Sequence, residues 1–162
     1  MREQLRKILC RSGASVMFAG VGNVLRSDDG AGVYIVSSLK PQGDISTLLV
    51  EASIENYISK INSIGPDILI IADCIDFNRE PGFSGLIPID QIHEFTISSH
   101  NISLKRVAEY LKMEVYVIGV QPADLRVSEN MTPAVKKAAD EIVSQINETI
   151  SECHSLKEQN HP

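Results

Sequence analysis

Acidic side chains and one histidine occupy positions in this sequence where they could hold a metal ion or activate water. Asp28 and Asp29 are adjacent, in the stretch FAGVGNVLRSDDGAG at residues 18–32. Asp73 follows the apolar run DILIIA, and His100 lies in the polar stretch SSHN. Carboxylate oxygens and an imidazole nitrogen together suit zinc, nickel, manganese or iron, with coordination positions left for a substrate. We therefore take Asp29, Asp73 and His100 as the candidate ligand set.

The sequence does not identify a general base. Asp28, Glu51 and Asp76 are all candidates, because each follows a predicted strand. Either acid of the adjacent pair could instead cap the helix that follows it. Cys74 could act as a nucleophile with His100 as its base. A buried thiol at the end of a strand is the simpler interpretation of Cys74.

Two other site chemistries fit the sequence less well. Gly20-Val21-Gly22 resembles part of a dinucleotide-binding turn, but Leu25 stands where that pattern has its third glycine. A carboxylate about 5 Å from a phosphate would repel it by several kcal/mol, whereas a helix N-terminus returns only about 0.3–1 kcal/mol. A phosphoacceptor receiver domain would need a lysine after the fifth strand, where this chain has Gln121.

The apolar spacing predicts alternating strands and helices that would position these side chains. The carboxyl ends of parallel strands meet at one sheet edge, where ligands bind in open α/β folds. We expect a twisted, mostly parallel five-stranded sheet with helices on both faces, as a three-layer α/β sandwich over residues 1–150, then a polar, frayed tail over 151–162. The expected strands are 15–19, 46–51, 67–72, 85–89 and 114–120, and the expected helices are 2–11, 31–39, 55–64, 99–111 and 132–150.

Composition excludes some classes of partner. The 162 residues contain 15 Lys plus Arg and 21 Asp plus Glu, for a net charge of −6, so nucleic-acid binding is not expected. No apolar run approaches the roughly 20 residues of a membrane span. Cys10, Cys74 and Cys153 are odd in number and share no motif spacing. We therefore expect no disulfide and a reducing cytoplasm.

Four segments resemble one known family in the same order along residues 15–150. GVGNVLRSDDGAGV is similar to the signature of the hydrogenase maturation endopeptidases, and ILIIADCID, SSHNISL and VIGVQP resemble three further segments of that family. The resemblance implies a monomeric peptidase with a twisted, mostly parallel sheet between helices. It implies removal of a C-terminal extension from the large-subunit precursor of a nickel–iron hydrogenase, after nickel insertion.

The resemblance also implies roles for particular residues. Asp29, Asp73 and His100 match the family's metal-contacting positions, and the metal is expected to be nickel carried by the substrate. The isolated protein could hold another divalent cation there. Residues 51–56 read EASIEN, whereas the family usually has an aspartate followed by Gly and Pro-Glu-Asn. A non-catalytic nickel-sensing partner of the precursor and a metal-dependent hydrolase of small amides remain as alternatives.

Overall fold

The protein is built on one five-stranded sheet with the strand order β2-β1-β3-β5-β4. The computed structural model describes residues 1–50, 53–92 and 104–159. Strands β1, β2, β3 and β5 pair in parallel, and β4 pairs with β5 in antiparallel orientation. This confirms the predicted mostly parallel sheet. The strands are β1 Val16–Val21, β2 Ile45–Val50, β3 Ile68–Cys74, β4 Ser84–Pro88 and β5 Glu114–Val120.

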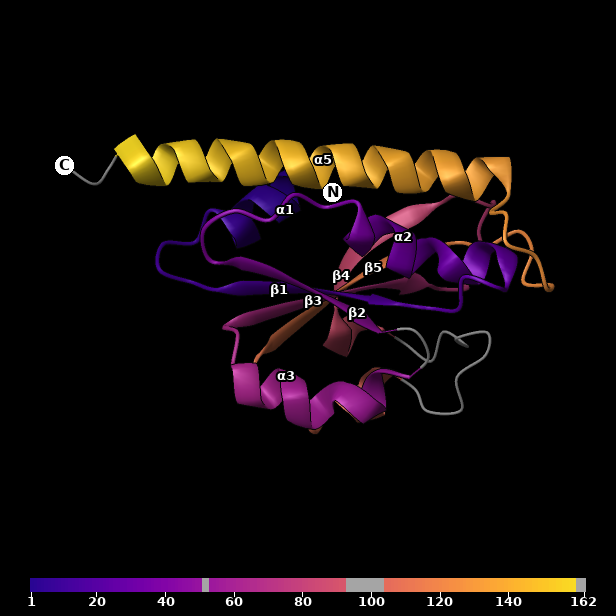
Figure 1. The fold of residues 1–162 in the computed structure, drawn as a ribbon, viewed down its shortest axis with the longest axis horizontal. Coiled ribbons are helices and arrows are strands. Elements are labelled where there is room, and N and C mark those ends of the chain that lie inside the picture. The colour runs from indigo at the N-terminus through magenta and orange to yellow at the C-terminus, as the bar shows by residue number, and fades with distance from the viewer. Residues whose placement is uncertain (51–52, 93–103, 160–162) are drawn as a thin grey trace.

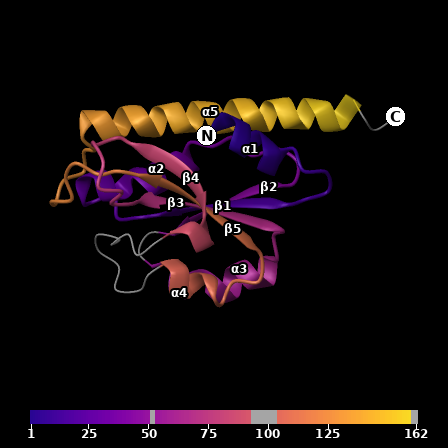
Figure 2. The same ribbon diagram turned by 180° about the vertical axis from the view of Figure 1, so that it is seen from behind.

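Helices cover both faces of the sheet, as predicted. The sheet lies between two layers of helices (Figures 1 and 2). The first layer contains α1 Arg2–Leu9, α2 Ala31–Ser37 and α5 Pro133–Gln159, and the second contains α3 Ile58–Ile64 and α4 Leu104–Ala108. Each layer encloses its own apolar core against the sheet.

Strands β1 and β3, which lead to the two acids, lie in the interior of the sheet. Every residue of β1 and of β3 is buried, which fits strands covered on both faces. The strand predicted for residues 67–72 extends to Cys74 in the structure. Asp73 therefore lies within β3 rather than after it. Pro88 ends β4 at the edge of the sheet, where a missing N–H donor is tolerated.

The C-terminal segment differs from its expectation. The tail predicted to fray from residue 151 is helical as far as Gln159, because α5 continues without a break. Ile146, Ile150 and Cys153 are all buried. These positions lie four and three residues apart and therefore share one helix face. The helix crosses the whole molecule above α1 and α2 (Figure 1).

The cysteine expectation is also wrong. Cys10 and Cys153 form a disulfide, with their Cα atoms 5.0 Å apart and a separation of 143 positions in sequence. Cys10 follows α1 and Cys153 lies in α5, and these two helices pack together. The pairing depends on that long-range packing and leaves no local spacing signal. Of the described helices, none is long and apolar enough to cross a membrane.

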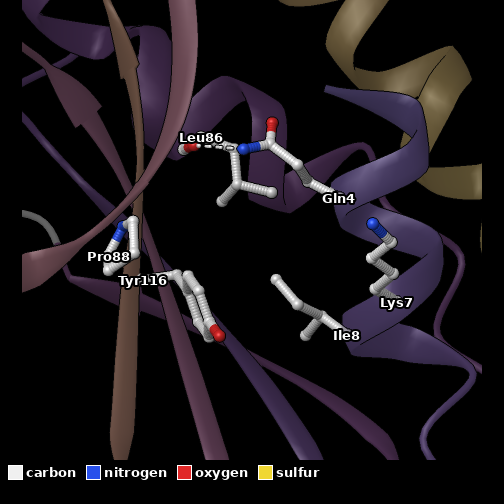
Figure 3. A pocket seen from close by; sticks show the side chains of 6 residues that line it. All are labelled: Gln4, Lys7, Ile8, Leu86, Pro88 and Tyr116. Carbon is white, nitrogen blue, oxygen red and sulfur yellow. Dashed lines mark hydrogen bonds between the residues drawn. The ribbon is translucent and has the colours of Figure 1, made fainter.

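A small pocket lies between α1 and the β4–β5 edge of the sheet (Figure 3). Its volume is about 150 Å³. Gln4 donates a hydrogen bond across it to the Leu86 carbonyl at 3.4 Å. Its lining residues are Gln4, Lys7, Ile8, Leu86, Pro88 and Tyr116, and none of them is a predicted site residue.

Candidate active site

Two buried carboxylates lie together at the carboxyl edge of the sheet. Asp29 is only 3% exposed and lies in the short 3-10 turn Ser27–Gly30 that leads into α2. Asp73 is 2% exposed and lies near the end of β3. They are close enough for the charge of Asp29 to affect the ionisation of Asp73. The structure thus brings together two of the three predicted ligands.

Glycines allow this approach by letting α2 lie directly on the sheet. A Cβ atom at Gly32 would lie 2.1 Å from the Ala72 carbonyl oxygen and 2.3 Å from that of Val21. Gly22 has a φ of +138°, and a Cβ there would lie 1.8 Å from the Asp29 carbonyl oxygen. Both positions therefore require glycine. The glycines therefore allow the segment that carries Asp29 to lie close to the carboxyl edge of the sheet.

Among the described residues, Asp29 and Asp73 each accept one hydrogen bond, which leaves most of their oxygen lone pairs without donors from this part of the chain. Asp29 Oδ2 accepts a hydrogen bond from the backbone N–H of Asn23 at 3.2 Å. Asp73 Oδ1 accepts one from the backbone N–H of Cys74 at 2.8 Å. Across residues 1–50, 53–92 and 104–159, neither carboxylate forms an ion pair. Acceptor oxygens remain available to a cation or to a substrate.

Burial raises the pKa of Asp73 well above its ordinary value, and the nearby charge of Asp29 raises it further. The hydrogen bond from the Cys74 backbone opposes this rise. Two like charges in a site of low dielectric destabilise each other. A strongly perturbed carboxyl beside a second acid at a sheet edge is a common property of functional sites.

Asp28 is fully buried but serves a different purpose from its neighbour. Its Oδ2 accepts hydrogen bonds from the backbone N–H groups of Ala123 at 2.8 Å and Asp124 at 2.9 Å. Oδ1 accepts one from the Thr132 N–H at 2.7 Å, and the Thr132 hydroxyl donates to Oδ2 at 3.0 Å. These four bonds fix the loop between β5 and α5. Thr132, the first residue of the helix predicted over 132–150, is therefore a partner of Asp28 that the sequence did not reveal.

Cys74 is buried and adjacent to the two acids. Its thiol donates to the Asp28 carbonyl oxygen at 2.7 Å. Burial raises the pKa of this thiol well above its usual value, and the charges of Asp73, Asp29 and Asp28 raise it further. A thiol with a raised pKa forms little thiolate, which is the nucleophilic form. These surroundings favour the interpretation of Cys74 as a buried packing residue.

The remaining predicted residues lie apart from this pair or outside the described residues. Asp76 is exposed, and its Oδ1 accepts hydrogen bonds from the Asn78 N–H and the Gln121 side chain. His100 and Glu51 lie outside the described residues. Within the described part of the chain, no group of three or more His, Cys, Asp and Glu side chains could hold a metal ion.

Gln121 has a structural role that its position after β5 did not reveal. Its buried side chain accepts hydrogen bonds at Oε1 from the backbone N–H groups of Phe77 at 2.7 Å and Arg79 at 3.2 Å. This residue therefore holds the loop that follows β3. The polar strand-end residue was visible in the sequence, but its partners lie more than 40 positions away.

Comparison with known proteins identifies relatives over most of the chain. Residues 33–149 match the family described as hydrogenase maturation protease. The hydrogenase 3 maturation protease of Escherichia coli K12 is 30% identical over 132 residues, which cover 78% of this chain and 85% of that protein.

Solved structures share the fold. The solution structure of an E. coli endopeptidase superposes with a TM-score of 0.74 and 28% identity, covering 83% of this chain and 90% of that one. The crystal structure of a NiFe hydrogenase maturation protease from Thermococcus kodakarensis gives a TM-score of 0.77 at 24% identity, covering 91% and 99% of the two chains. The chain with its paired buried acids therefore belongs to the hydrogenase maturation protease family of hydrolytic enzymes.

Proposed function

We propose that this protease removes a C-terminal extension from the large-subunit precursor of a nickel–iron hydrogenase. In this proposal Asp29, Asp73 and His100 contact nickel that the precursor already carries. The observation that carries the proposal is the buried Asp29–Asp73 pair, whose oxygens have few donors among the residues that the structure describes. A divalent cation delivered by the substrate would relieve the repulsion between the two carboxylates.

The chemistry is hydrolysis of one peptide bond. Water adds to the scissile carbonyl carbon, the C–N bond breaks, and the extension leaves with a new amino terminus. Substrate-borne nickel would polarise this carbonyl or acidify the attacking water. The role of this protein is to hold acidic ligands at the sheet edge and to bind the substrate there.

The contacts in the structure bear on which acid could serve as general base. Both carboxylate oxygens of Asp28 already accept hydrogen bonds from the loop between β5 and α5, which favours a structural role. Asp76 is exposed and bonded to its own loop. Glu51 lies outside the described residues. The proposal therefore assigns general-base chemistry to none of the three.

The test is cleavage of purified precursor, with and without nickel, followed by mass spectrometry. We expect a mass loss equal to the extension only for the nickel-loaded precursor. Asp29→Asn, Asp73→Asn and His100→Ala should each lower the rate at least ~100-fold, the scale on which a single catalytic group acts. Asp44→Asn is the matched control, because Asp44 is an exposed acid on the segment that enters β2.

Other outcomes would contradict the proposal. Unchanged cleavage by Asp29→Asn would overturn the site. Binding of the nickel-loaded precursor without cleavage would favour a nickel-sensing partner. A stoichiometric ion in the isolated protein, with turnover of small amides, would favour the small-amide hydrolase. The proposal retains a monomeric, cytoplasmic enzyme, and size-exclusion chromatography with light scattering checks the monomer.

A further inference from the structure

Three large apolar side chains are exposed on two loops beside the acidic pair. Val24 and Leu25, after β1, are 52% and 55% exposed, and Val127, before α5, is 88% exposed. We call these three residues the apolar rim. Single exposed apolar side chains are ordinary on a protein surface, whereas a cluster beside a functional site indicates an interaction.

The two loops that carry the apolar rim lie side by side. Leu25 O accepts a hydrogen bond from the Ser128 N–H at 3.0 Å, and the Ser27 N–H donates to Ser128 O at 2.7 Å. Arg26 and Ser128 form a parallel bridge. Figure 1 shows both loops at the same end of the molecule. Leu25 and Val127 therefore stand on adjoining backbone segments.

Hydrogen bonds hold both loops in place. The Leu25 N–H donates to Asn23 Oδ1 at 2.9 Å, and the Ser27 hydroxyl donates to the Asn130 carbonyl at 3.0 Å. Asp28 fixes both ends of the second loop through Ala123 and Thr132. The exposed side chains of the apolar rim therefore stand on backbone segments that hydrogen bonds hold in place.

Val24 connects the apolar rim to the segment that carries Asp29. The Asn23 N–H contacts Asp29 Oδ2, and Val24 is the next residue. A Cβ atom at Gly30 would lie 3.0 Å from Val24 Cα. Val24 thus packs against the residue that follows Asp29.

We infer that the apolar rim binds apolar side chains of the substrate polypeptide next to the scissile bond, and so contributes to substrate selection. This inference rests on the proposed function, because its occupant is the precursor that the protease cuts. Three side chains offer far less than the ~1,000 Å² that a stable protein interface buries. An area of this size fits a few residues of an extended segment better than a second copy of this chain.

The experiment compares the double variant Leu25→Ser/Val127→Ser with wild type and with Ile64→Ser. Ile64 is a matched control, because it is apolar, 52% exposed and located at the end of α3, before the amino end of β3. Binding of nickel-loaded precursor is measured by interferometry, and KM and kcat for its cleavage by mass spectrometry. Thermal unfolding checks that each variant folds, and exposed substitutions of this kind have little effect on stability.

We expect the double variant to bind the precursor about tenfold more weakly and to show a KM about tenfold higher. Its kcat should stay within about twofold of wild type, because the apolar rim does not touch the reacting atoms. Ile64→Ser should match wild type in both. Replacement by Leu25→Met/Val127→Ile, which keeps the apolar surface, should preserve binding.

The outcomes separate this inference from the proposed function. Wild-type affinity and KM in the double variant would overturn the inference while leaving the protease assignment intact. Binding by wild type without cleavage would contradict the proposed function, and weaker binding of the double variant would still support the apolar rim. No binding of the precursor by wild type would overturn both.

Discussion

Asp28 and Asp29 are neighbours in sequence, and both are buried, yet their surroundings are opposite. Asp28 accepts four hydrogen bonds from residues 95 to 104 positions away. Within the described part of the chain, Asp29 accepts one, from the backbone of Asn23, and it lies close to a second carboxylate. Adjacent acids can therefore have different surroundings: Asp28 organises the loop between β5 and α5, whereas Asp29 Oδ1 has no donor among the described residues.

The largest expected effect comes from removing the structural acid. Asp28→Ala leaves the N–H groups of Ala123, Asp124 and Thr132 buried or half-buried without their acceptor. Each unsatisfied donor costs about 1–3 kcal/mol, so we expect the free energy of unfolding to fall by about 3–5 kcal/mol. Urea denaturation followed by circular dichroism measures it. A loss under 1 kcal/mol would show that Asp28 does not organise this loop.

A smaller effect of opposite sign is expected at the acidic pair. The pKa of Asp73 is raised in the folded protein, chiefly by burial. Between its unfolded pKa of about 3.9 and its folded pKa, the folded state therefore holds a proton that the unfolded state has lost, so stability falls as pH rises through that window. Asp73→Asn removes this loss and should stabilise the protein by about 1 kcal/mol or more at pH 7, with little effect near pH 4.

Denaturation of wild type and Asp73→Asn at both pH values tests this prediction. Asp140→Asn serves as a control, because the Asp140 carboxylate is exposed and paired with Lys136, which lowers its pKa. The same stability difference at pH 4 and pH 7 would contradict a buried, repelling pair. Gains in stability at functional sites commonly accompany lost activity, and Asp73→Asn should show both.

A single contact of Asp28, its hydrogen bond from the Thr132 hydroxyl, gives a further test of the difference between the two acids. Thr132→Val keeps the backbone donor to Asp28 but removes the hydroxyl that donates at 3.0 Å. One lost hydrogen bond to a charged group should lower the free energy of unfolding by about 1.5–3 kcal/mol, with processing activity within about threefold of wild type. Thr132→Ser, which retains the hydroxyl, should restore most of the stability. A loss of processing activity in Thr132→Val with no loss of stability would contradict the separate roles of the two acids.

Local patterns predicted much of the fold and one acid pair. Continuous apolar runs identified the buried strands, whereas the close approach of α2 that requires Gly22 and Gly32 was seen only in the structure. These signals are local, because burial and backbone conformation restrict the residue type at each position. The junction of Asp29 with Asp73 followed from the rule that parallel strands end at one edge.

Long-range contacts explain what the sequence did not disclose. The partners of Asp28 and Gln121, and the Cys10–Cys153 disulfide, join residues more than 40 positions apart. No periodicity records such pairings. The helical end of α5 was a missed local signal, because Ile146, Ile150 and Cys153 already follow helical spacing. Its polar composition led to the expectation of a frayed tail.

In the proposed function, Asp29 contacts the nickel of the substrate and Asp28 does not. The most direct test is the single-turnover rate of precursor cleavage by Asp29→Asn, measured beside Asp28→Asn at a temperature at which both variants are folded. We predict at least ~100-fold slower cleavage by Asp29→Asn, with unfolding stability equal to wild type or higher. Asp28→Asn should unfold more easily but cleave at a rate close to wild type. Full-rate cleavage by folded Asp29→Asn would contradict the account.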